Sequence, residues 1–256
     1  MNAIELDIMR GMVSILNEAN EAFRNGKPIM SDEQFAVRSN DLAILEEETG
    51  VVLLNSPHCT IDVRSIIKVL ENKNDRLKEY QDVNDIVEFS NQKELIAHVD
   101  VCGLGMVITY INGCIDNIQV NNVDEHVLDA ICSLSIPCCI SKNTEYSVVG
   151  KLAIADKPAF YATEAINGGC NTLKDNLNEA RCLGFDIVQN WNIANLNQKS
   201  FQNTVNYIFE CLDEENVPCG GIVFKLNDIE YGKMLSVMSG NLYNGIIIKR
   251  KEASAS

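Results

Sequence analysis

The sequence has few basic residues and no long apolar run, and both shortages exclude classes of protein. Over 256 residues, 36 acidic residues outnumber 21 basic ones, which gives a formal net charge of -15. A surface this acidic repels the phosphate backbone of nucleic acid, which proteins bind through clustered Lys and Arg. No stretch reaches the roughly 18 apolar residues that a membrane span requires. We therefore expect no extended nucleic-acid binding and no membrane insertion.

The ten cysteines lack the spacing of a metal site or a disulfide framework. No CxxC pair occurs, Cys138 and Cys139 are adjacent, and the chain has only 3 His. The residues up to Arg10 carry charges where a signal peptide has its apolar core. We interpret the cysteines as reduced thiols that fill small buried spaces in a cytoplasmic protein.

Apolar spacing near the N-terminus predicts a helical hairpin. One stripe recurs every three or four residues: Ile4, Ile8, Met12, Ile15 and Leu16. Residues 25–28, with Gly26 and Pro28, end this helix, and Ser31 caps a second helix by accepting from the amide of Gln34. The second helix runs to Glu48. We predict a helical subdomain over residues 1–55.

From Ser56 onward the pattern changes to short apolar or alternating runs. Strands are predicted at 95–102, 104–111, 114–120, 146–154, 185–189, 220–226 and 244–250. Asn112-Gly113 is a two-residue hairpin signal between the second and third of these. A helix is predicted over 198–212, with an apolar face of Phe201, Val205, Ile208 and Leu212. The fold class is therefore α+β and rich in antiparallel pairs, with a domain over 56–250 and a disordered tail over 251–256.

Several motifs, in order along nearly the whole chain, resemble those of NAD-dependent DNA ligases. The matching segments are Pro28 to Phe35, Leu45-Glu46, Ser56-Pro57, Val69 to Asn72, His98 to Gly103, Tyr110 to Gly113, Gly184-Phe185, Gly221 to Asp228 and Ile246 to Lys249. The resemblance implies a nucleotidyltransferase fold behind an NMN-binding helical subdomain. The family's oligonucleotide-binding, zinc, helix-hairpin-helix and BRCT modules have no counterpart here, so we expect no DNA-encircling role.

The resemblance also implies that the ligase chemistry is lost. The family's lysine, whose amine takes AMP from NAD, corresponds to Asp100, and an anion there repels the phosphate. Three further charged positions differ: Cys102 and Gly220 replace acids, and Lys151 replaces a glutamate. On the NMN side Asp32 matches, but polar groups of the family give way to Ala22, Phe23, Phe35 and Ala36. We expect no enzyme and no required cofactor, with NAD or a related nucleotide as a ligand.

Two lysines match the family's phosphate-facing pair. Lys225 and Lys249 each end a run rich in β-branched residues. Together they would bind a phosphate or pyrophosphate, whereas each alone is equally understood as a solvated edge lysine. Asp100 either contacts a ribose hydroxyl or pairs with one of these lysines.

The other candidate nucleotide-binding residues have simpler interpretations too. Leu70 and Glu71 would lie against the base or begin a helix, and His98 would meet an adenine amine or sit in the core. Gly103 and Gly221 would let a ligand approach the backbone closely, or would ease a bend in a strand. Trp191 would stack on a base or pack as an ordinary apolar side chain. Lys151 is the last of the candidate nucleotide-binding residues.

Three functions remain open. The first is an inactive ligase-like protein that binds and sequesters an NAD-derived, adenine or cyclic signalling nucleotide, as a viral counter-defence protein in a host cytoplasm would. The second is a pseudoenzyme that acts through a protein partner, as an accessory ligase subunit or an inhibitor. The third is residual NAD-dependent adenylyl transfer through Lys151 or Cys102.

Overall fold

A computed structural model describes residues 3–70, 78–79, 83–142, 144–155, 157–194, 198–214, 219–238 and 245–250. The chain forms two compact units, and each is described by itself. Unit 1 holds the described residues within 1–70, 104–167 and 179–186, and unit 2 holds those within 71–103, 168–178 and 187–256. The predicted domain boundary at residue 55 stays a prediction, and the tail over 251–256 lies outside the described residues.

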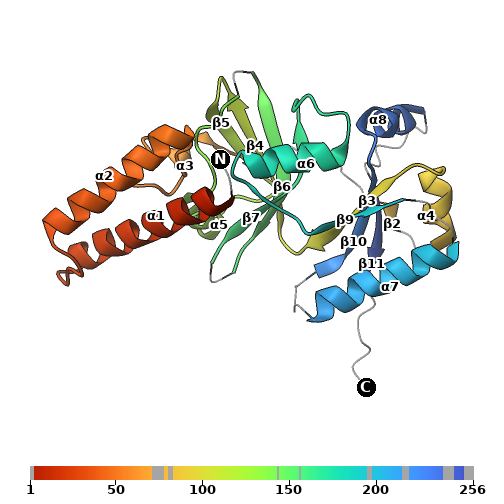
Figure 1. The fold of residues 1–256 in the computed structure, drawn as a ribbon, viewed down its shortest axis with the longest axis horizontal. Coiled ribbons are helices and arrows are strands. Elements are labelled where there is room, and N and C mark those ends of the chain that lie inside the picture. The colour runs from red at the N-terminus through yellow and green to blue at the C-terminus, as the bar shows by residue number, and fades with distance from the viewer. Residues whose placement is uncertain are drawn as a thin grey trace. The chain divides into compact units, whose positions relative to one another are not determined.

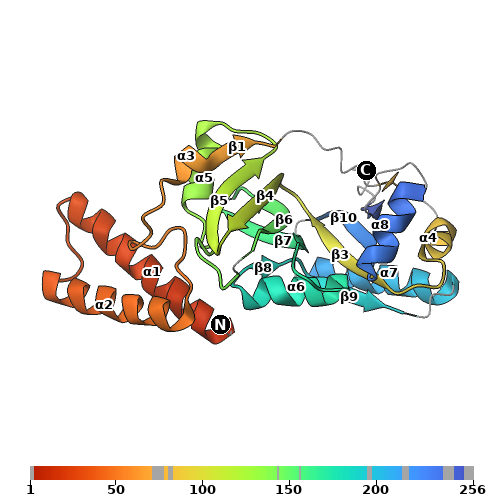
Figure 2. The ribbon, with the colours of Figure 1, turned by 90° about the horizontal axis from the view of Figure 1, so that it is seen from above.

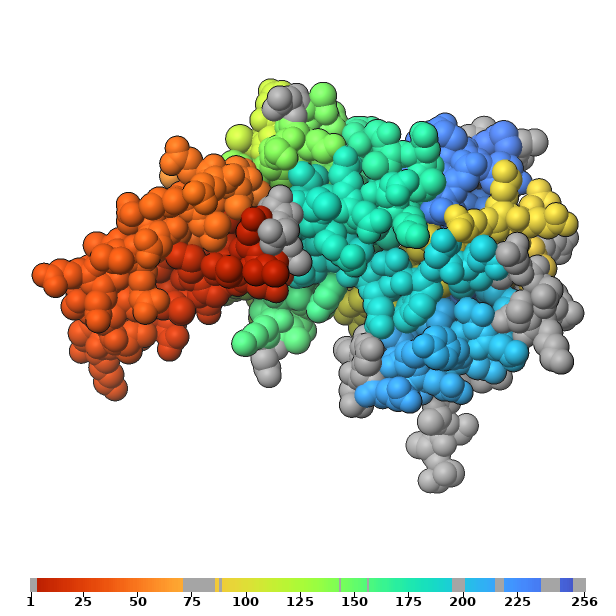
Figure 3. All heavy atoms as spheres, in the orientation of Figure 1, coloured from red at the N-terminus to blue at the C-terminus, as the bar shows by residue number. Residues whose placement is uncertain are grey.

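Unit 1 begins with the predicted helical hairpin, made of α1 (Ala3–Arg24) and α2 (Asp32–Thr49). Ser31 caps α2 by accepting from the Gln34 amide, and the Gln34 side chain accepts from the Ser31 amide in return. Gly50, at φ 66°, ends the helix in the left-handed conformation. The two helices lie side by side in Figures 1 and 2, and their side chains form one continuous red and orange surface in Figure 3.

The predicted apolar stripe of α1 is only partly buried, since Leu16 lies in the hairpin core and Met12 packs against that core. Ile4, Ile8 and Ile15 are exposed, at 73%, 52% and 39% of their surface. The hairpin core instead holds Leu6, Met9, Val13, Leu16, Leu42, Val51 and Leu53. Helix α1 has apolar residues on two sides at the same period, so periodicity alone does not choose the side that meets α2.

The rest of unit 1 is organised on a six-stranded sheet in the order β1-β5-β4-β6-β7-β8. Its strands are β1 (Ile67–Val69), β4 (Leu104–Ile111), β5 (Cys114–Val120), β6 (Tyr146–Ala153), β7 (Ala159–Ile166) and β8 (Asp186–Ile187). The pair β1–β5 is parallel, whereas β5–β4, β4–β6 and β6–β7 are antiparallel. Two helices, α3 (Val63–Ile66) and α5 (Glu125–Cys132), accompany this sheet.

The predicted hairpin between β4 and β5 is confirmed. Asn112 and Gly113 both have positive φ, at 52° and 82°, as a two-residue type I′ turn requires. A side chain at Gly113 would also press on the Ile140 carbonyl oxygen, 2.7 Å from the place of its Cβ. The turn therefore needs glycine for its backbone angle and for its contact with the segment around Ile140.

Unit 2 is built on a five-stranded sheet in the order β2-β11-β10-β3-β9. Its strands are β2 (Lys78–Glu79), β3 (Leu95–Val101), β9 (Asn190–Ile193), β10 (Cys219–Leu226) and β11 (Ile246–Lys249). Every pair is antiparallel except β2–β11. The unit also contains α4 (Val83–Ser90), α7 (Gln198–Glu214) and α8 (Ile229–Met238), and α6 (Leu173–Cys182) begins in it.

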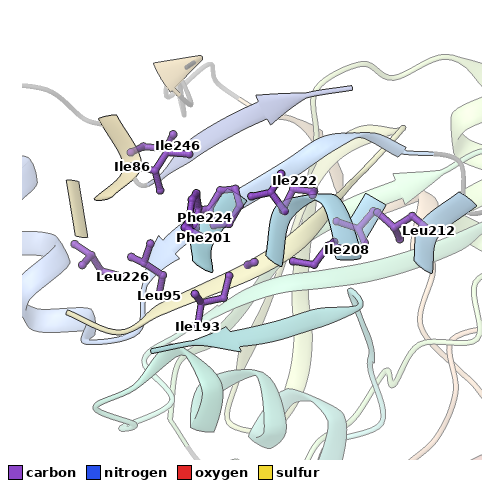
Figure 4. Close-up of a cluster of buried hydrophobic side chains, with 13 residues drawn as sticks. Ile86, Leu95, Ile193, Phe201, Ile208, Leu212, Ile222, Phe224, Leu226 and Ile246 are labelled. Atoms are coloured by element: carbon purple, nitrogen blue, oxygen red, sulfur yellow. The ribbon is translucent and has the colours of Figure 1, made fainter. Parts of the chain in front are cut away.

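One face of this sheet packs against α4 and α7. The predicted apolar face of α7 is confirmed, because Phe201, Val205, Ile208 and Leu212 are all buried there. Figure 4 shows side chains of β3, β9, β10 and β11 meeting those of the two helices, with Phe201 against Phe224 at 5.1 Å between ring centroids. We call this set of side chains the α7 core.

The strands that the sequence predicts are all present, and the α+β fold class is confirmed. The sequence does not predict helices α3, α4, α5, α6 and α8 or strands β1, β2, β7 and β9. Most of them are short, and their apolar residues are too few to give a clear period without the surfaces that they pack on. Within the described part of the chain, no helix has both the length and the apolar character needed to cross a bilayer.

Candidate functional site

Strand β3 separates the α7 core from the predicted site. Leu95, Ala97 and Val99 are buried in the α7 core. Successive side chains of a strand point to opposite faces, so Ile96, His98 and Asp100 face the other side of the sheet. The alternation of β3 therefore places two predicted site residues, His98 and Asp100, on one face.

The strand register brings both predicted lysines to this same face. Asp100 pairs with Gly221, and Gly221 pairs with Lys249 on the next strand. Lys225 lies opposite Ile96. Residues directly opposite one another in an antiparallel sheet share a face. We call the surface that carries these residues the lysine face: Ile96, His98, Asp100, Gly221, Val223, Lys225, Ile247 and Lys249.

The two lysines are separated along the lysine face. Lys249 lies beside Gly221, four residues before Lys225, which corresponds to roughly 13 Å along a strand at about 3.3 Å per residue. Lys225 is half-buried and Lys249 is exposed. A ligand with charges at two places would reach both lysines more readily than a single phosphate would. Their convergence on one pocket stays a prediction.

Steric crowding is the simplest explanation for Gly220 and Gly221 on strand β10. A Cβ at Gly221 would collide with the Ile248 carbonyl oxygen, and one at Gly220 would lie 3.0 Å from Asp100 Oδ2. Gly220 also lies where the register shifts between Cys219 and Gly221. The carboxylate of Asp100 thus lies against the backbone of β10. Gly103 is exposed in the bend between β3 and β4.

The thiol of Cys219, which lies near Asp100, has a raised pKa. Burial raises the pKa of Cys219, and the nearby Cys102 and Asp100 raise it further, while a backbone hydrogen bond with Gly221 lowers it. A protonated thiol is a weak nucleophile. Among the residues that the structure describes, no group of three or more His, Cys, Asp and Glu is arranged to hold a metal ion.

The remaining predicted residues have distinct surroundings. His98 is only 4% exposed, with Nδ1 3.0 Å from the Val99 carbonyl oxygen, so its burial favours the core interpretation over an adenine contact. Leu70 continues the β1 ladder, since its amide donates to the Val120 carbonyl. Lys151 lies half-buried on β6 in unit 1, between Gly105 and Tyr161 of its neighbours. Glu71 lies outside the described residues, and Trp191 packs on the α7 core.

A hydrogen-bond network at the Lys225 end of the sheet is not signalled by the sequence. Asn227, 6% exposed, donates to Glu94, and Glu94 also accepts from Asn192. The side-chain oxygen of Asn227 accepts from the amide of Lys174 at the start of α6. Only strand pairing brings these residues together, because Glu94 and Asn227 are 133 positions apart.

A Ser–His–Glu series in unit 1 has the residue types of a nucleophile, base and acid. Glu46, 5% exposed, accepts from His58 Nδ1 at 2.6 Å and from the Ser56 hydroxyl at 2.7 Å. The other ring nitrogen of His58 lies 2.9 Å from the Ser39 hydroxyl. Ser39 is inside α2, however, where amides already donate to carbonyls four residues earlier, so they cannot stabilise an oxyanion. The series is best explained as a clasp that fixes residues 56–58 to α2.

The comparisons relate this chain to DNA ligases at low identity. It is 21% identical over 293 residues to a DNA ligase of Lachnoclostridium phytofermentans, with 94% of this chain and 44% of that protein covered. A DNA ligase of Ruminiclostridium cellulolyticum is 20% identical over 288 residues, with 91% and 43% covered. The chain spans less than half the length of these curated relatives. No family model matches it.

Solved structures of ligases are also similar. An archaeal ATP-dependent RNA ligase superposes with a TM-score of 0.46 at 7% identity, covering 68% of this chain and 47% of that one. A structure from a structure-function analysis of Lig E DNA ligases superposes with a TM-score of 0.38 at 10% identity, covering 71% and 70%.

Replacement of His58 tests the clasp. We expect His58→Ala to lower the free energy of unfolding by about 2 kcal/mol, because the buried Glu46 carboxylate loses a hydrogen-bond donor. Ser39→Ala, which removes only the outer hydroxyl, should lower it by less than about 1 kcal/mol. Adding Glu46→Gln to His58→Ala should restore part of the loss. Urea denaturation of the wild-type protein and the three variants measures the free energy of unfolding. Equal losses in His58→Ala and Ser39→Ala would contradict the clasp.

Proposed function

We propose that this protein binds an adenine-type or NAD-derived nucleotide on the lysine face and holds it without transferring the adenylate. One observation supports the proposal most directly: the strand register collects Asp100, Lys225 and Lys249 on a single face. The similarity to DNA ligases supports a nucleotide as the ligand. The motif resemblance adds that Asp100 occupies the position of the ligase nucleophile.

The side chain of Asp100 is the reason to propose binding without turnover. Ligase adenylation requires an amine with a free lone pair that attacks the α-phosphorus and keeps AMP as a phosphoramidate. A carboxylate at this position is an anion, so it opposes the approach of phosphate and offers no nitrogen. Cys219 nearby is kept as a thiol by its raised pKa, so it does not replace the lost nucleophile.

The two lysines supply the attraction for the ligand. Each charge-assisted hydrogen bond to a phosphate contributes about 1.5–3 kcal/mol. The separation of Lys225 and Lys249 along β10 favours a ligand with at least two anionic groups, such as a dinucleotide, over a mononucleotide with a single phosphate. Sequestration also requires a dissociation constant below about 1 μM, which corresponds to ~8 kcal/mol.

The same proposal covers the biological setting. A protein that captures a signalling nucleotide without consuming it would suit viral counter-defence in a host cytoplasm, and it would require no cofactor. The net charge of -15 argues against binding of extended nucleic acid. A mobility-shift assay with nicked duplex DNA tests this part separately, since the relatives are DNA ligases.

Removal of both lysines tests the binding face. We expect the double variant Lys225→Ala, Lys249→Ala to weaken binding of NAD, ADP-ribose or a cyclic dinucleotide at least about 100-fold, because two charge-assisted contacts are lost. Lys27→Ala removes one lysine charge from the exposed turn of the helical hairpin and should leave affinity unchanged. Calorimetry with this panel measures the effect, and the absence of heat with every nucleotide would exclude the proposal.

Neutralisation of Asp100 tests its role on the same face. If its carboxylate only repels phosphate, Asp100→Asn should tighten binding several-fold, and the gain should shrink as salt is raised. We expect this outcome because Asp100 lies on the face that carries both lysines. Weaker binding by Asp100→Asn would instead assign the carboxylate to a ribose hydroxyl. The titration uses the nucleotide that binds the wild-type protein.

Intact-mass measurement tests the loss of adenylyl transfer. After incubation with NAD or ATP and Mg²⁺, we expect no mass increase that corresponds to a covalent AMP, because the nucleophilic amine is missing. An AMP adduct that maps to Lys151 or Cys102 would establish residual catalysis and overturn the proposal.

A protein partner is the second candidate function, and the acidic composition favours it. A net charge of -15 steers association toward a basic surface. Under this alternative, the Lys225 and Lys249 double variant would still recover the same stoichiometric partner as the wild-type protein, and nucleotide would not compete for it.

A further inference from the structure

Two cysteines of unit 1 face each other across a short β-bridge. Cys114 begins β5, and it pairs in antiparallel orientation with Cys139 in the segment after α5. Their sulfur atoms are 4.0 Å apart, and both thiols are reduced. Cys114 is exposed and Cys139 is half-buried, so a small reagent in solvent meets Cys114 first.

The backbone around this pair has the geometry that a disulfide needs. The amide of Ile115 donates to the Cys138 carbonyl, and the amide of Ile140 donates to the Gly113 carbonyl. These bonds flank Cys114 and Cys139, so the two residues form a non-hydrogen-bonded pair, in which Cα atoms lie about 4.5 Å apart. Disulfides accept Cα separations of about 4.4–6.8 Å. Rotation of the two side chains would therefore bring the sulfurs into bonding distance without movement of the strands.

We propose that Cys114 and Cys139 form a thiol–disulfide exchange site that takes low-molecular-weight disulfides of the glutathione type and closes into a reversible cross-strand disulfide. In the first step the Cys114 thiolate attacks one sulfur of the reagent, and one glutathione leaves as a thiolate. In the second step the Cys139 thiolate attacks the Cys114 sulfur, and the second glutathione leaves. The two cysteine protons end on the two released glutathiones, so one reagent disulfide is reduced for each protein disulfide formed.

The surroundings of the pair support this order of steps. Burial raises the pKa of Cys139, and the neighbouring Cys114 raises it further. Cys138 lies behind the pair, in the interior, and burial also raises its pKa. Cys139 therefore suits the resolving role, in which proximity to the mixed disulfide compensates for a small thiolate fraction.

Closure of the disulfide would fasten the 137–140 segment to the β4–β5 hairpin. That segment already holds the Pro137 carbonyl, which accepts from the buried Tyr110 hydroxyl at 2.6 Å, and the Leu53–Pro137 bridge. The cross-link restricts the unfolded chain over about 25 residues, so we expect the melting temperature to rise by about 5 °C or more.

Redox titration of the whole chain tests the site. Reduced protein is equilibrated with glutathione at increasing ratios of oxidised to reduced form, then alkylated and mapped by mass spectrometry. We expect the wild-type protein to lose two alkylatable thiols without retaining glutathione, with a cross-linked peptide that joins Cys114 to Cys139. Dithiothreitol should restore both thiols.

Three single variants separate the two roles. Cys139→Ser should retain one stable glutathione at Cys114, whereas Cys114→Ser should retain none at Cys139 and form no cross-link. Cys182→Ser removes another exposed thiol of unit 1 and should behave as the wild-type protein. A cross-link that maps to any other pair, or a wild-type protein that stops at the mixed disulfide, would overturn the proposal.

Discussion

The alternation of side chains along β3 is the constraint on which the candidate site depends. Leu95, Ala97 and Val99 are buried against α7, and each large buried apolar side chain contributes about 1.5–3 kcal/mol. A one-residue slip of β3 would take all three out of the α7 core and turn the polar side chains of His98 and Asp100 into it. A single charged contact with a ligand, at about 1.5–3 kcal/mol, cannot offset that loss. The position of Asp100 on the lysine face is therefore fixed by the core and not by any ligand.

This constraint bears on Asp100, which stands where the resemblance to DNA ligases implies a lysine. In a position fixed by the core, the side chain points to the same face of the sheet whether it ends in an amine or in a carboxylate. A lysine would attract phosphate and attack it, whereas Asp100 opposes it beside Lys249, across Gly221. In the proposed function, the same backbone presents a nucleotide-binding surface without the group that performs the transfer. Binding and chemistry are separable in this proposal because the α7 core lies on the opposite face of the sheet.

Features that depend on contacts between residues far apart in the chain could not be predicted from the sequence. The helices of the N-terminal hairpin were predicted, but the stripe of Ile4, Ile8 and Ile15 is exposed. The Glu46–His58 clasp and the Glu94–Asn227 network join residues whose types are common and whose positions show no pattern. From the sequence, Cys114 and Cys139 are interpreted only as thiols that fill buried space. A sequence without CxxC gives no sign that these two residues meet. Each of these features arises from contacts that local periodicity does not encode.

The sequence is sufficient to predict strands β3, β4, β5, β6, β8, β10 and β11, the capped helix that begins after Ser31, the Asn112-Gly113 turn and the apolar face of α7. These follow from local rules, namely side-chain period, capping and positive φ, which act over a few residues. Three features can be known only from the tertiary structure. They are the buried side of α1, the interior position of His98, and the common face of Asp100, Lys225 and Lys249. Those outcomes depend on strand order and register, which are set when distant segments compete to bury apolar surface together.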